Sequence, residues 1–275
     1  TVRRPGETGG MTTPRRTALL FALAIVLLLL IPLTGSRYLV DLSTEILIYV
    51  LFALSLNLLI GYAGNVSFGH AAYFAIGGYS CAILLTTYEW PLVFSFLAAM
   101  ALSGLASFCI GFFCVRLTDI YFSMLTLAFA MLVWSIAFKW RSVTGGDDGF
   151  VGVSIPSMLN SRTAYFYFTL SVVALSTGML WLICHSAFGR TLIAVRENPI
   201  RAGFVGVDTR RLRLMAFVVS GVFAGIAGAL FAMYNQGMYT ESAYWTASAQ
   251  VLIMTLLGGI YSFFGPALGA VVLYL

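Results

Sequence analysis

The chain has 275 residues, of which 60% are hydrophobic and only 9% are charged, and its formal net charge is +5. Soluble domains carry about 25% charged residues, so a chain this poor in charge cannot cover a water-facing surface. Its arginines cluster at the ends of apolar runs, a pattern that orients membrane proteins. We therefore expect contact with membrane lipid and no nucleic-acid partner.

A helix that crosses a membrane needs about 20 mostly apolar residues. In chain order, apolar runs cover residues 17–34, 38–60, 70–88, 92–115, 120–138, 165–184, 214–234 and 243–257, and a ninth begins near residue 266. These runs predict an all-α, polytopic transmembrane helical bundle of about 8–10 spans. We expect a polar N-terminal tail over residues 1–16 and a single transmembrane domain over residues 17–275. Met11 fits a native start, and the ninth run stops at Leu275 without the polar flank of a typical span, so we expect a truncated C-terminus.

The basic residues predict which loops face the cytoplasm. With a cytoplasmic N-terminus, eleven arginines lie inside and four basic residues lie outside, as the preference of Lys and Arg for the inner side requires. The eleven are Arg3, Arg4, Arg15, Arg16, Arg116, Arg190, Arg196, Arg201, Arg210, Arg211 and Arg213, and the four are Arg37, Lys139, Arg141 and Arg162. This orientation makes loop 186–213 cytoplasmic and loop 139–163 external.

Side chains that could perform chemistry are scarce. An ATP-binding P-loop needs a lysine between glycine and Ser or Thr, and the one lysine, Lys139, has no such neighbours. His70 and His185 are far apart in the sequence. The cysteines lie in apolar runs without metal-ligand spacing, so we predict that they are small buried hydrophobic residues. They are Cys81, Cys109, Cys114 and Cys184. We expect no catalytic residue, no metal and no cofactor bound by this chain.

Residues 198–206 of the basic loop predict a short helix that is capped at both ends. Asn198 is a preferred N-cap residue, Pro199 is favoured at the first helical position, and Gly206 suits the left-handed position that ends a helix. A helix of roughly two turns is marginal in water, so it must pack against another protein or against the rim of this one. Asp208 or Thr209 then caps the following span.

The stretch 57–70 is the most polar one near a membrane boundary. Irregular backbone survives at membrane depth only where protein or a watery cavity surrounds it. Two interpretations remain open, namely a pathway lining or gate and a tight turn between spans. The predicted orientation puts the stretch near the inner face, which favours a cytoplasmic gate over a midplane binding site. The candidate residues are Asn57, Gly61, Gly64, Asn65, Ser67, Gly69 and His70.

Two acidic regions are predicted near the outer face. Arg37, Asp41 and Glu45 follow one another at intervals of four, which favours a local ion pair over a polar entrance for a zwitterionic substrate. The glycine-rich stretch 144–149 lacks the alternating oxygen ligands of a calcium loop. It is either a turn or part of a docking surface, with Thr144, Gly145, Gly146, Asp147 and Gly149 as the candidate residues.

Small residues recur at intervals of four in the apolar run 214–234. Gly221 and Gly225 form a GxxxG pair, and Ser220, Ala224 and Gly228 repeat at the same interval. Such faces let helices approach closely in a membrane. We expect this face to pack within the chain rather than to form a dimer seam.

The basic loop also carries a resemblance to a known family. Ala202, followed after three residues by Gly206, resembles the coupling helix of ABC importer permeases over residues 197–208. The chain as a whole resembles the M-type permeases of branched-chain amino acid importers in LLIGYAGNVSFGHAA (58–72), TGGDDG (144–149) and LLGGIYSFFGPALG (256–269). The blocks occur in order along nearly the whole chain. The doubled Asp147–Asp148, where the family has one acid, and a shorter C-terminus depart from its pattern.

The resemblance implies a multi-subunit importer in a bacterial inner membrane. Its expected partners are a second homologous permease subunit, two cytoplasmic ATPase subunits that carry ATP and Mg, and an external substrate-binding protein that would dock on residues 144–149. This chain would supply half of the translocation pathway. The residues implied in coupling to the ATPases are Glu197, Asn198, Pro199, Arg201, Ala202, Gly206 and Asp208.

The cargo is less well defined by the sequence. Leucine, isoleucine and valine are the family's usual substrates, whereas urea, short amides and other amino acids are alternatives. A secondary transporter would need an acid in the middle of a span, and only Glu45 could serve. A passive water channel is disfavoured because Asn198–Pro199 is the one Asn-Pro pair.

Overall fold

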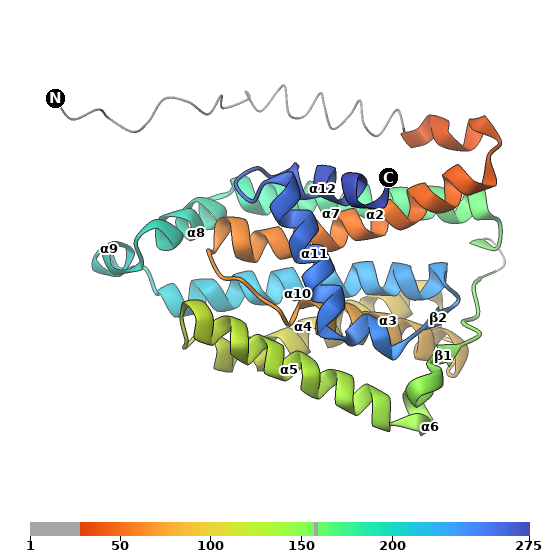
Figure 1. Ribbon diagram of the computed structural model, residues 1–275, viewed down its shortest axis with the longest axis horizontal. Coiled ribbons are helices and arrows are strands. Elements are labelled where there is room, and N and C mark those ends of the chain that lie inside the picture. The colour runs from red at the N-terminus through yellow and green to blue at the C-terminus, as the bar shows by residue number, and fades with distance from the viewer. Residues whose placement is uncertain (1–27, 157–158) are drawn as a thin grey trace.

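The computed structural model describes residues 28–156 and 159–275, and most of these residues are helical (Figure 1). The longer helices are α2 (Arg37–Asn57), α3 (His70–Thr86), α4 (Leu92–Cys114), α5 (Asp119–Lys139), α7 (Arg162–His185), α8 (Ala187–Glu197), α10 (Thr209–Tyr234), α11 (Trp245–Gly258) and α12 (Gly265–Tyr274). The shorter elements are η1 (Ile31–Thr34), the π-helical η2 (Leu58–Tyr62), α6 (Arg141–Thr144), η3 (Gly146–Asp148), β1 (Phe150–Val151), α9 (Pro199–Phe204), β2 (Gly237–Met238) and η5 (Thr240–Ala243). The predicted all-α class is confirmed. The tail over residues 1–16 and most of the first predicted span lie outside the described residues.

Five of the described helical segments are long and apolar enough to cross a membrane. They are Arg37–Tyr62, Leu92–Cys114, Ile120–Lys139, Arg162–His185 and Thr209–Tyr234. The apolar helices α3, α11 and α12 have 17, 14 and 10 residues. At 1.5 Å per residue, the longest of these three reaches only about 26 Å, whereas a hydrocarbon core is about 30 Å thick. Three of the predicted runs therefore form shorter helices, which are joined to their neighbours by irregular backbone over residues 63–69 and 259–264.

The two loops that the arginine pattern assigns to opposite sides lie at opposite ends of the bundle (Figure 1). One end carries α8 and α9, and the other carries α6, β1 and β2. The strands β1 and β2 pair in antiparallel fashion, with Phe150 opposite Met238 and Val151 opposite Gly237. This two-stranded sheet joins the loop after α5 to the segment that follows α10. We refer to the end with α9 as the inner end and to the end with the sheet as the outer end, after the predicted orientation.

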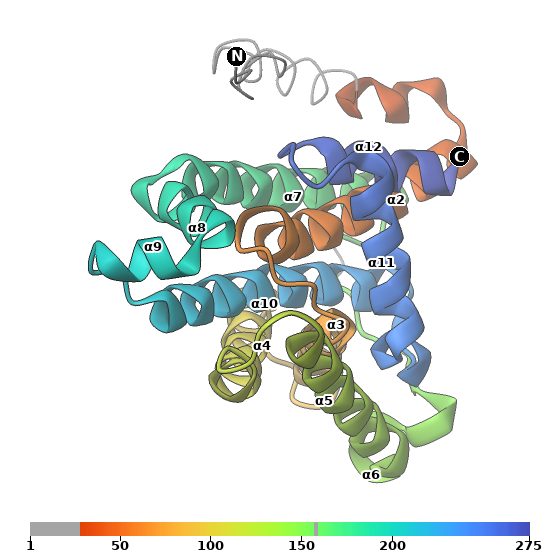
Figure 2. The same ribbon diagram turned by 60° about the vertical axis from the view of Figure 1, so that its left-hand side comes forward.

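Helix α10 runs through the middle of the bundle, with α2 and α7 on one side and α4 and α5 on the other (Figure 2). Its small residues explain how it fits there. A side chain at Gly225 would overlap Ser103 of α4, and one at Gly228 would overlap the carbonyl group of Phe74 in α3. The GxxxG face is thus used for packing within the chain, as predicted.

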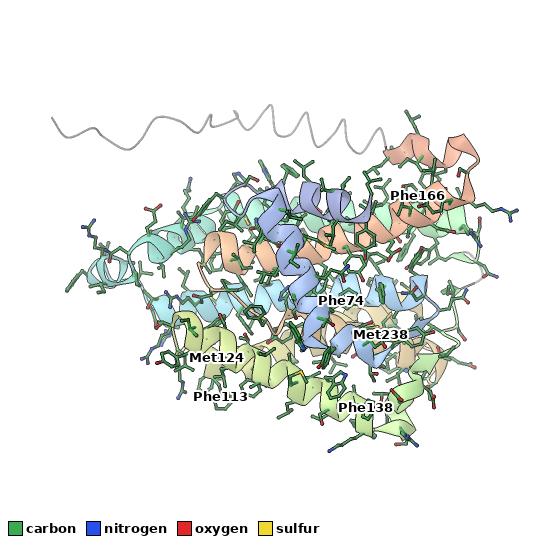
Figure 3. The ribbon with its side chains drawn as sticks, in the orientation of Figure 1. Phe74, Phe113, Met124, Phe138, Phe166 and Met238 are labelled. Atoms are coloured by element: carbon green, nitrogen blue, oxygen red, sulfur yellow. The ribbon has the colours of Figure 1, made fainter. Side chains whose placement is uncertain are left out.

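The side chains divide into a buried interior and an apolar exterior (Figure 3). Phe74, Phe166 and Met238 are buried, whereas Phe113 and Met124 are more than half exposed on α4 and α5. An exposed apolar surface on long helices is what lipid requires. The prediction that the cysteines are buried holds for Cys81, Cys114 and Cys184, but it is wrong for Cys109, which lies on the exposed side of α4.

Candidate functional site

Helix α9 has the capped geometry that its sequence predicts. The Asn198 side-chain oxygen accepts a hydrogen bond from the Arg201 amide at 2.9 Å, and Pro199 occupies the first turn. Gly206 has a φ of +89°, and the Val207 amide bonds back to the Ala202 carbonyl at 3.1 Å. This six-to-one bond around a left-handed glycine is a Schellman cap. The helix itself is one and a half turns long, from Pro199 to Phe204.

The apolar side chains of α9 point away from the protein. Phe204 is 88% exposed, and the neighbouring Val205 and Ile200 are similarly uncovered. Ala202 is the buried residue of this helix, and Arg201 is exposed. A side chain at Gly206 would meet no atom within 4 Å, so its role is to permit the left-handed turn rather than a close contact. The short helix therefore presents an apolar tip to its surroundings, anchored to the protein through Ala202.

The prediction that residues 186–213 form a loop around one short helix is incomplete, because they also contain α8. Ser186 caps this helix by accepting from the Phe188 amide at 3.2 Å. Gly189, Leu192 and Val195 form its buried face. Their spacing of three residues indicates a helix. The arginines in the same stretch made it look like a polar loop instead. At the other end of the loop Asp208 caps α10 as predicted, since its carboxylate accepts from the Arg211 amide at 3.1 Å.

The polar stretch 57–70 is not a tight turn at the inner face. Helix α2 ends in the π-helical η2, and the chain then runs back into the bundle before α3 begins at His70. The His70 ring Nε2 lies 2.8 Å from the hydroxyl of Ser55, which precedes Tyr62 by seven residues on α2. At 1.5 Å per residue, the stretch therefore re-enters by about 10 Å. The stretch therefore begins at the inner end, as expected, and its later residues lie deeper in the bundle than the sequence indicated.

Neighbouring helices supply hydrogen bonds to this re-entrant segment, residues 63–69. The Ser123 hydroxyl donates to the Val66 carbonyl at 2.7 Å. Thr126, also on α5, accepts from the Phe68 amide at 3.3 Å. Just beyond the segment, Ser248 of α11 accepts from the Ala71 amide in the first turn of α3 at 2.8 Å. The irregular backbone is thus surrounded by protein, as membrane depth demands.

The candidate residues of the stretch 57–70 lie close to one another in the structure. Asn57, Asn65, Ser67, Gly69 and His70 are buried. Gly61 lies against the carbonyl of Ile260, while Gly64 is exposed. Two buried polar atoms, Asn57 Oδ1 and His70 Nδ1, have no hydrogen-bond partner among the described residues. Such atoms are uncommon in native interiors, and each calls for an explanation such as an ordered water or a functional role.

The glycine-rich loop at the outer end is a compact turn. The Thr144 hydroxyl is buried, and its one proton is shared between the Ala137 and Trp140 carbonyls at 2.5 and 2.8 Å. Gly145, Gly146 and Gly149 all have positive φ values. Asp147 is exposed, as is the adjacent Asp148. Of the five docking candidates, Asp147 alone is thus classed as exposed, and the others build the turn that holds it.

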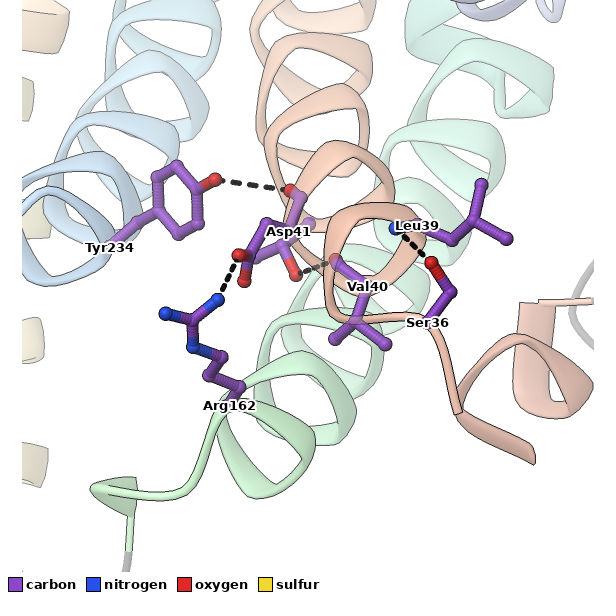
Figure 4. A network of polar contacts seen from close by, with 7 residues as sticks. Ser36, Leu39, Val40, Asp41, Arg162 and Tyr234 are labelled. Atoms are coloured by element: carbon purple, nitrogen blue, oxygen red, sulfur yellow. Dashed lines mark hydrogen bonds and ion pairs between the residues drawn. The ribbon is translucent and has the colours of Figure 1, made fainter. Parts of the chain in front are cut away.

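A second polar network joins three helices at the outer end (Figure 4). Arg162, at the start of α7, forms an ion pair of 2.5 Å with Asp41 of α2. The Tyr234 hydroxyl, at the end of α10, donates to the Asp41 carbonyl at 3.1 Å. The predicted local pair of Arg37 with Asp41 is therefore wrong. Sequence spacing could not reveal the actual partner because Arg162 is distant in the chain.

Titratable side chains form no metal centre in the described part of the chain. No three His, Cys, Asp or Glu residues there are grouped so that they could hold an ion. The arrangement instead offers an apolar helix tip, a re-entrant polar segment and an acidic turn at the far end.

Comparison with known proteins assigns the family. The family model for the branched-chain amino acid transport system permease component matches residues 38–275. The chain is 30% identical, over 92% of its length, to the high-affinity branched-chain amino acid transport system permease protein LivM of Escherichia coli (strain K12), and the match covers 66% of that protein. It is 26% identical over 84% of its length to the probable branched-chain amino acid transport permease protein LivM of Methanocaldococcus jannaschii, with 79% of that protein covered.

A more distant likeness covers half of the chain. The autoinducer 2 import system permease protein LsrC of Salmonella paratyphi B is 34% identical over 51% of this chain and 40% of its own length. No solved structure is significantly similar. The chain spans slightly less than two thirds of the length of the LivM proteins of Escherichia coli and Salmonella typhimurium. The match over residues 38–275 nonetheless shows that the chain belongs to the permease component family of branched-chain amino acid transport systems.

Proposed function

We propose that this chain is a membrane-embedded permease subunit of an ATP-driven importer, and that α9 is its contact with a cytoplasmic ATPase subunit. The single observation that carries the proposal is the exposed apolar tip of α9. Phe204, Val205 and Ile200 are each more than 70% exposed on a helix that is held by caps at both ends.

Such a tip is unfavourable in water unless a partner covers it. Burying one of these side chains contributes roughly 1.5–3 kcal/mol. A helix of six residues is unstable in isolation, so its caps and the Ala202 anchor preserve a shape that suits a pocket on another protein. Arg201 and Glu197 flank the tip with charge and favour a partner that has polar groups around an apolar pocket.

The other partners follow from the same proposal. A second, related permease subunit would complete the translocation pathway, and two ATPase subunits would bind ATP and Mg. The re-entrant segment and His70 would line or gate the pathway between them. An external binding protein would dock on the acidic turn around Asp147, at the end opposite to α9. The assembly would reside in a bacterial inner membrane.

Branched-chain amino acids are the proposed cargo. Relatives named for branched-chain amino acid transport, LivM of Escherichia coli and of Methanocaldococcus jannaschii, match more than four fifths of this chain. The LsrC relative is named for autoinducer 2 import, so cargo differs among permeases similar to this chain. Urea, short amides and other amino acids are the alternative cargoes.

Replacement of Gly206 by arginine tests the proposal. Gly206→Arg forces a bulky charged residue into a left-handed position beside the apolar tip. We expect loss of the ATPase subunits during affinity purification and loss of ATP-dependent leucine uptake in proteoliposomes. Gly35→Arg is the matched control, because Gly35 also has a positive φ and open space around it but lies far from α9. Normal ATP-dependent uptake by Gly206→Arg, or uptake by the isolated wild-type chain without ATP, would contradict the proposal.

A further inference from the structure

Arg196 lies in the last turn of α8, two residues before the Asn198 cap of α9. We propose that Arg196 is a positioning residue that transmits movement of α9 to the interruption of α2 and to the turn between α11 and α12. This inference rests on the proposed function, since it assumes that α9 is moved by an ATPase. It goes further by naming the side chain that carries the movement into the membrane domain.

The guanidinium group of Arg196 binds a main-chain carbonyl inside the interruption. Its Nη1 donates a hydrogen bond to the Gly61 carbonyl. Gly61 belongs to the π-helical η2, where the Ala63 amide bonds to Leu58 and the Asn65 amide to Leu59. The chain then leaves the helix, so Arg196 supplies the Gly61 carbonyl with a donor from another helix. Only 23% of the Arg196 side chain is exposed, which makes this a charge-assisted bond that is sheltered from water.

The same guanidinium group faces an aromatic ring from a third segment. Its central carbon lies 5.1 Å from the centroid of the Tyr261 ring, within the range of a cation–π contact. Tyr261 belongs to the turn between α11 and α12. The Asn57 side-chain amide donates to the Ser262 carbonyl at 3.2 Å, so this turn already lies against the end of α2. Arg196 therefore contacts both sides of one junction.

The aliphatic part of the Arg196 side chain lies against the re-entrant segment. A side chain at Gly64 would come within 2.6 Å of Arg196 Cγ, so the re-entrant segment passes directly over the arginine stem. One side chain thus touches η2, the start of the re-entrant segment and the turn after α11. These three stretches lack regular α-helical hydrogen bonding, which makes them the parts of the bundle most able to rearrange.

A transmitting role requires an element with two alternative arrangements. We assign this role to the π-helical η2, because removing its extra residue from the turn would convert it to α-helix and would shift every later residue. Movement of α9 along its axis would pull on α8 and thereby on the Gly61 carbonyl. A merely structural arginine would stabilise the junction in one state, whereas a transmitting arginine links ATP hydrolysis to transport.

The test measures leucine transported per ATP hydrolysed in proteoliposomes that contain the complete importer and its binding protein. Arg196→Ala removes both contacts and also a 3.8 Å ion pair with the exposed Glu197, and we expect this ratio to fall by about tenfold because a charge-assisted bond and a cation–π contact are lost together. ATPase subunits should still copurify, since α9 keeps its caps. Arg190→Ala is the matched control, because Arg190 is an exposed arginine on the same helix. Its ratio should equal that of the wild type.

Variants of Tyr261 keep the test decisive if Arg196→Ala does not fold. Tyr261 is 81% exposed, so its replacement does not threaten the core. We expect Tyr261→Leu to lower the ratio by about threefold and Tyr261→Phe to leave it unchanged, because the phenyl ring preserves the cation–π contact. The double variant Arg196→Ala/Tyr261→Leu should be no worse than Arg196→Ala alone.

Two results would overturn the inference while the proposed function stands. They are an Arg196→Ala complex that transports leucine at the wild-type ratio, and equal ratios for Tyr261→Leu and Tyr261→Phe. Failure of the proposed function has a different signature, because the wild-type chain would then bind no ATPase subunit or would take up leucine without ATP.

Discussion

The contact between α3 and α10 depends on the absence of a side chain at Gly228. A methyl group there would overlap the Phe74 carbonyl and would come within 3.1 Å of the Gly78 amide nitrogen. Since both neighbours are backbone atoms, the two helices must move apart by roughly 1 Å, which forfeits a quarter to a half of the dispersion energy at each contact. Overpacking of this kind costs about 3 kcal/mol, and the better helix propensity of alanine offsets about 1 kcal/mol. We expect Gly228→Ala to destabilise the protein by about 2 kcal/mol.

Thermal unfolding of the purified protein in detergent, followed by tryptophan fluorescence, measures this effect. For a chain of this size, 2 kcal/mol corresponds to a decrease in Tm of roughly 4–8 °C. Gly178→Ala is the control, because Gly178 also lies within a membrane-length helix but has no atom within 4 Å of the added methyl group. Its Tm should be unchanged or higher. An unchanged Tm for Gly228→Ala, or equal decreases for both variants, would refute the packing argument.

Two further predictions concern hydrogen bonds and charge. Arg162→Gln removes the ion pair with Asp41, whose side chains are 61% and 36% exposed, so the loss should be only about 0.5 kcal/mol and should vanish in 1 M NaCl. If the difference in Tm between Arg162→Gln and the wild type were as large in 1 M NaCl, the ion pair would not be the cause of the destabilisation. Ser248→Ala leaves the buried Ala71 amide without its partner and should cost about 2 kcal/mol in the same unfolding assay. Thr255→Ala, which removes a hydroxyl bonded only within α11, should cost less than half as much, and equal losses would count against the cross-helix bond.

The sequence predicted the local features of the site better than the long-range ones. Asn198, Pro199 and Gly206 predicted both ends of α9, because capping depends on residues within one turn of the helix end. The partner of Asp41 could not be predicted in the same way. It is Arg162, which only the packing of α7 against α2 brings close.

The depth of the polar segment also escaped prediction. Glycines and polar residues indicated an interruption after α2, but a short turn and a re-entrant segment have the same composition. The deciding factor is a set of hydroxyl groups on α5 and α11. These hydroxyls form hydrogen bonds with main-chain groups of the segment and of the helix turn that follows it. The residues that carry those hydroxyls lie more than fifty residues away in the sequence. In the sequence alone, each of them looks like an ordinary small residue within an apolar run.

The hydrogen bonds of the re-entrant segment carry a consequence for how this region can open. Its main chain is held by Ser123 and Thr126 of α5, and Ser248 of α11 holds the first turn of α3 that follows it. Separating α5 from α11 would strip these bonds and leave bare peptide groups, which lipid cannot satisfy and water can. Opening and wetting of this region are therefore a single event. Any opening there must admit water to the exposed peptide groups, and in the closed arrangement the hydrogen bonds to the neighbouring helices hold the segment in place.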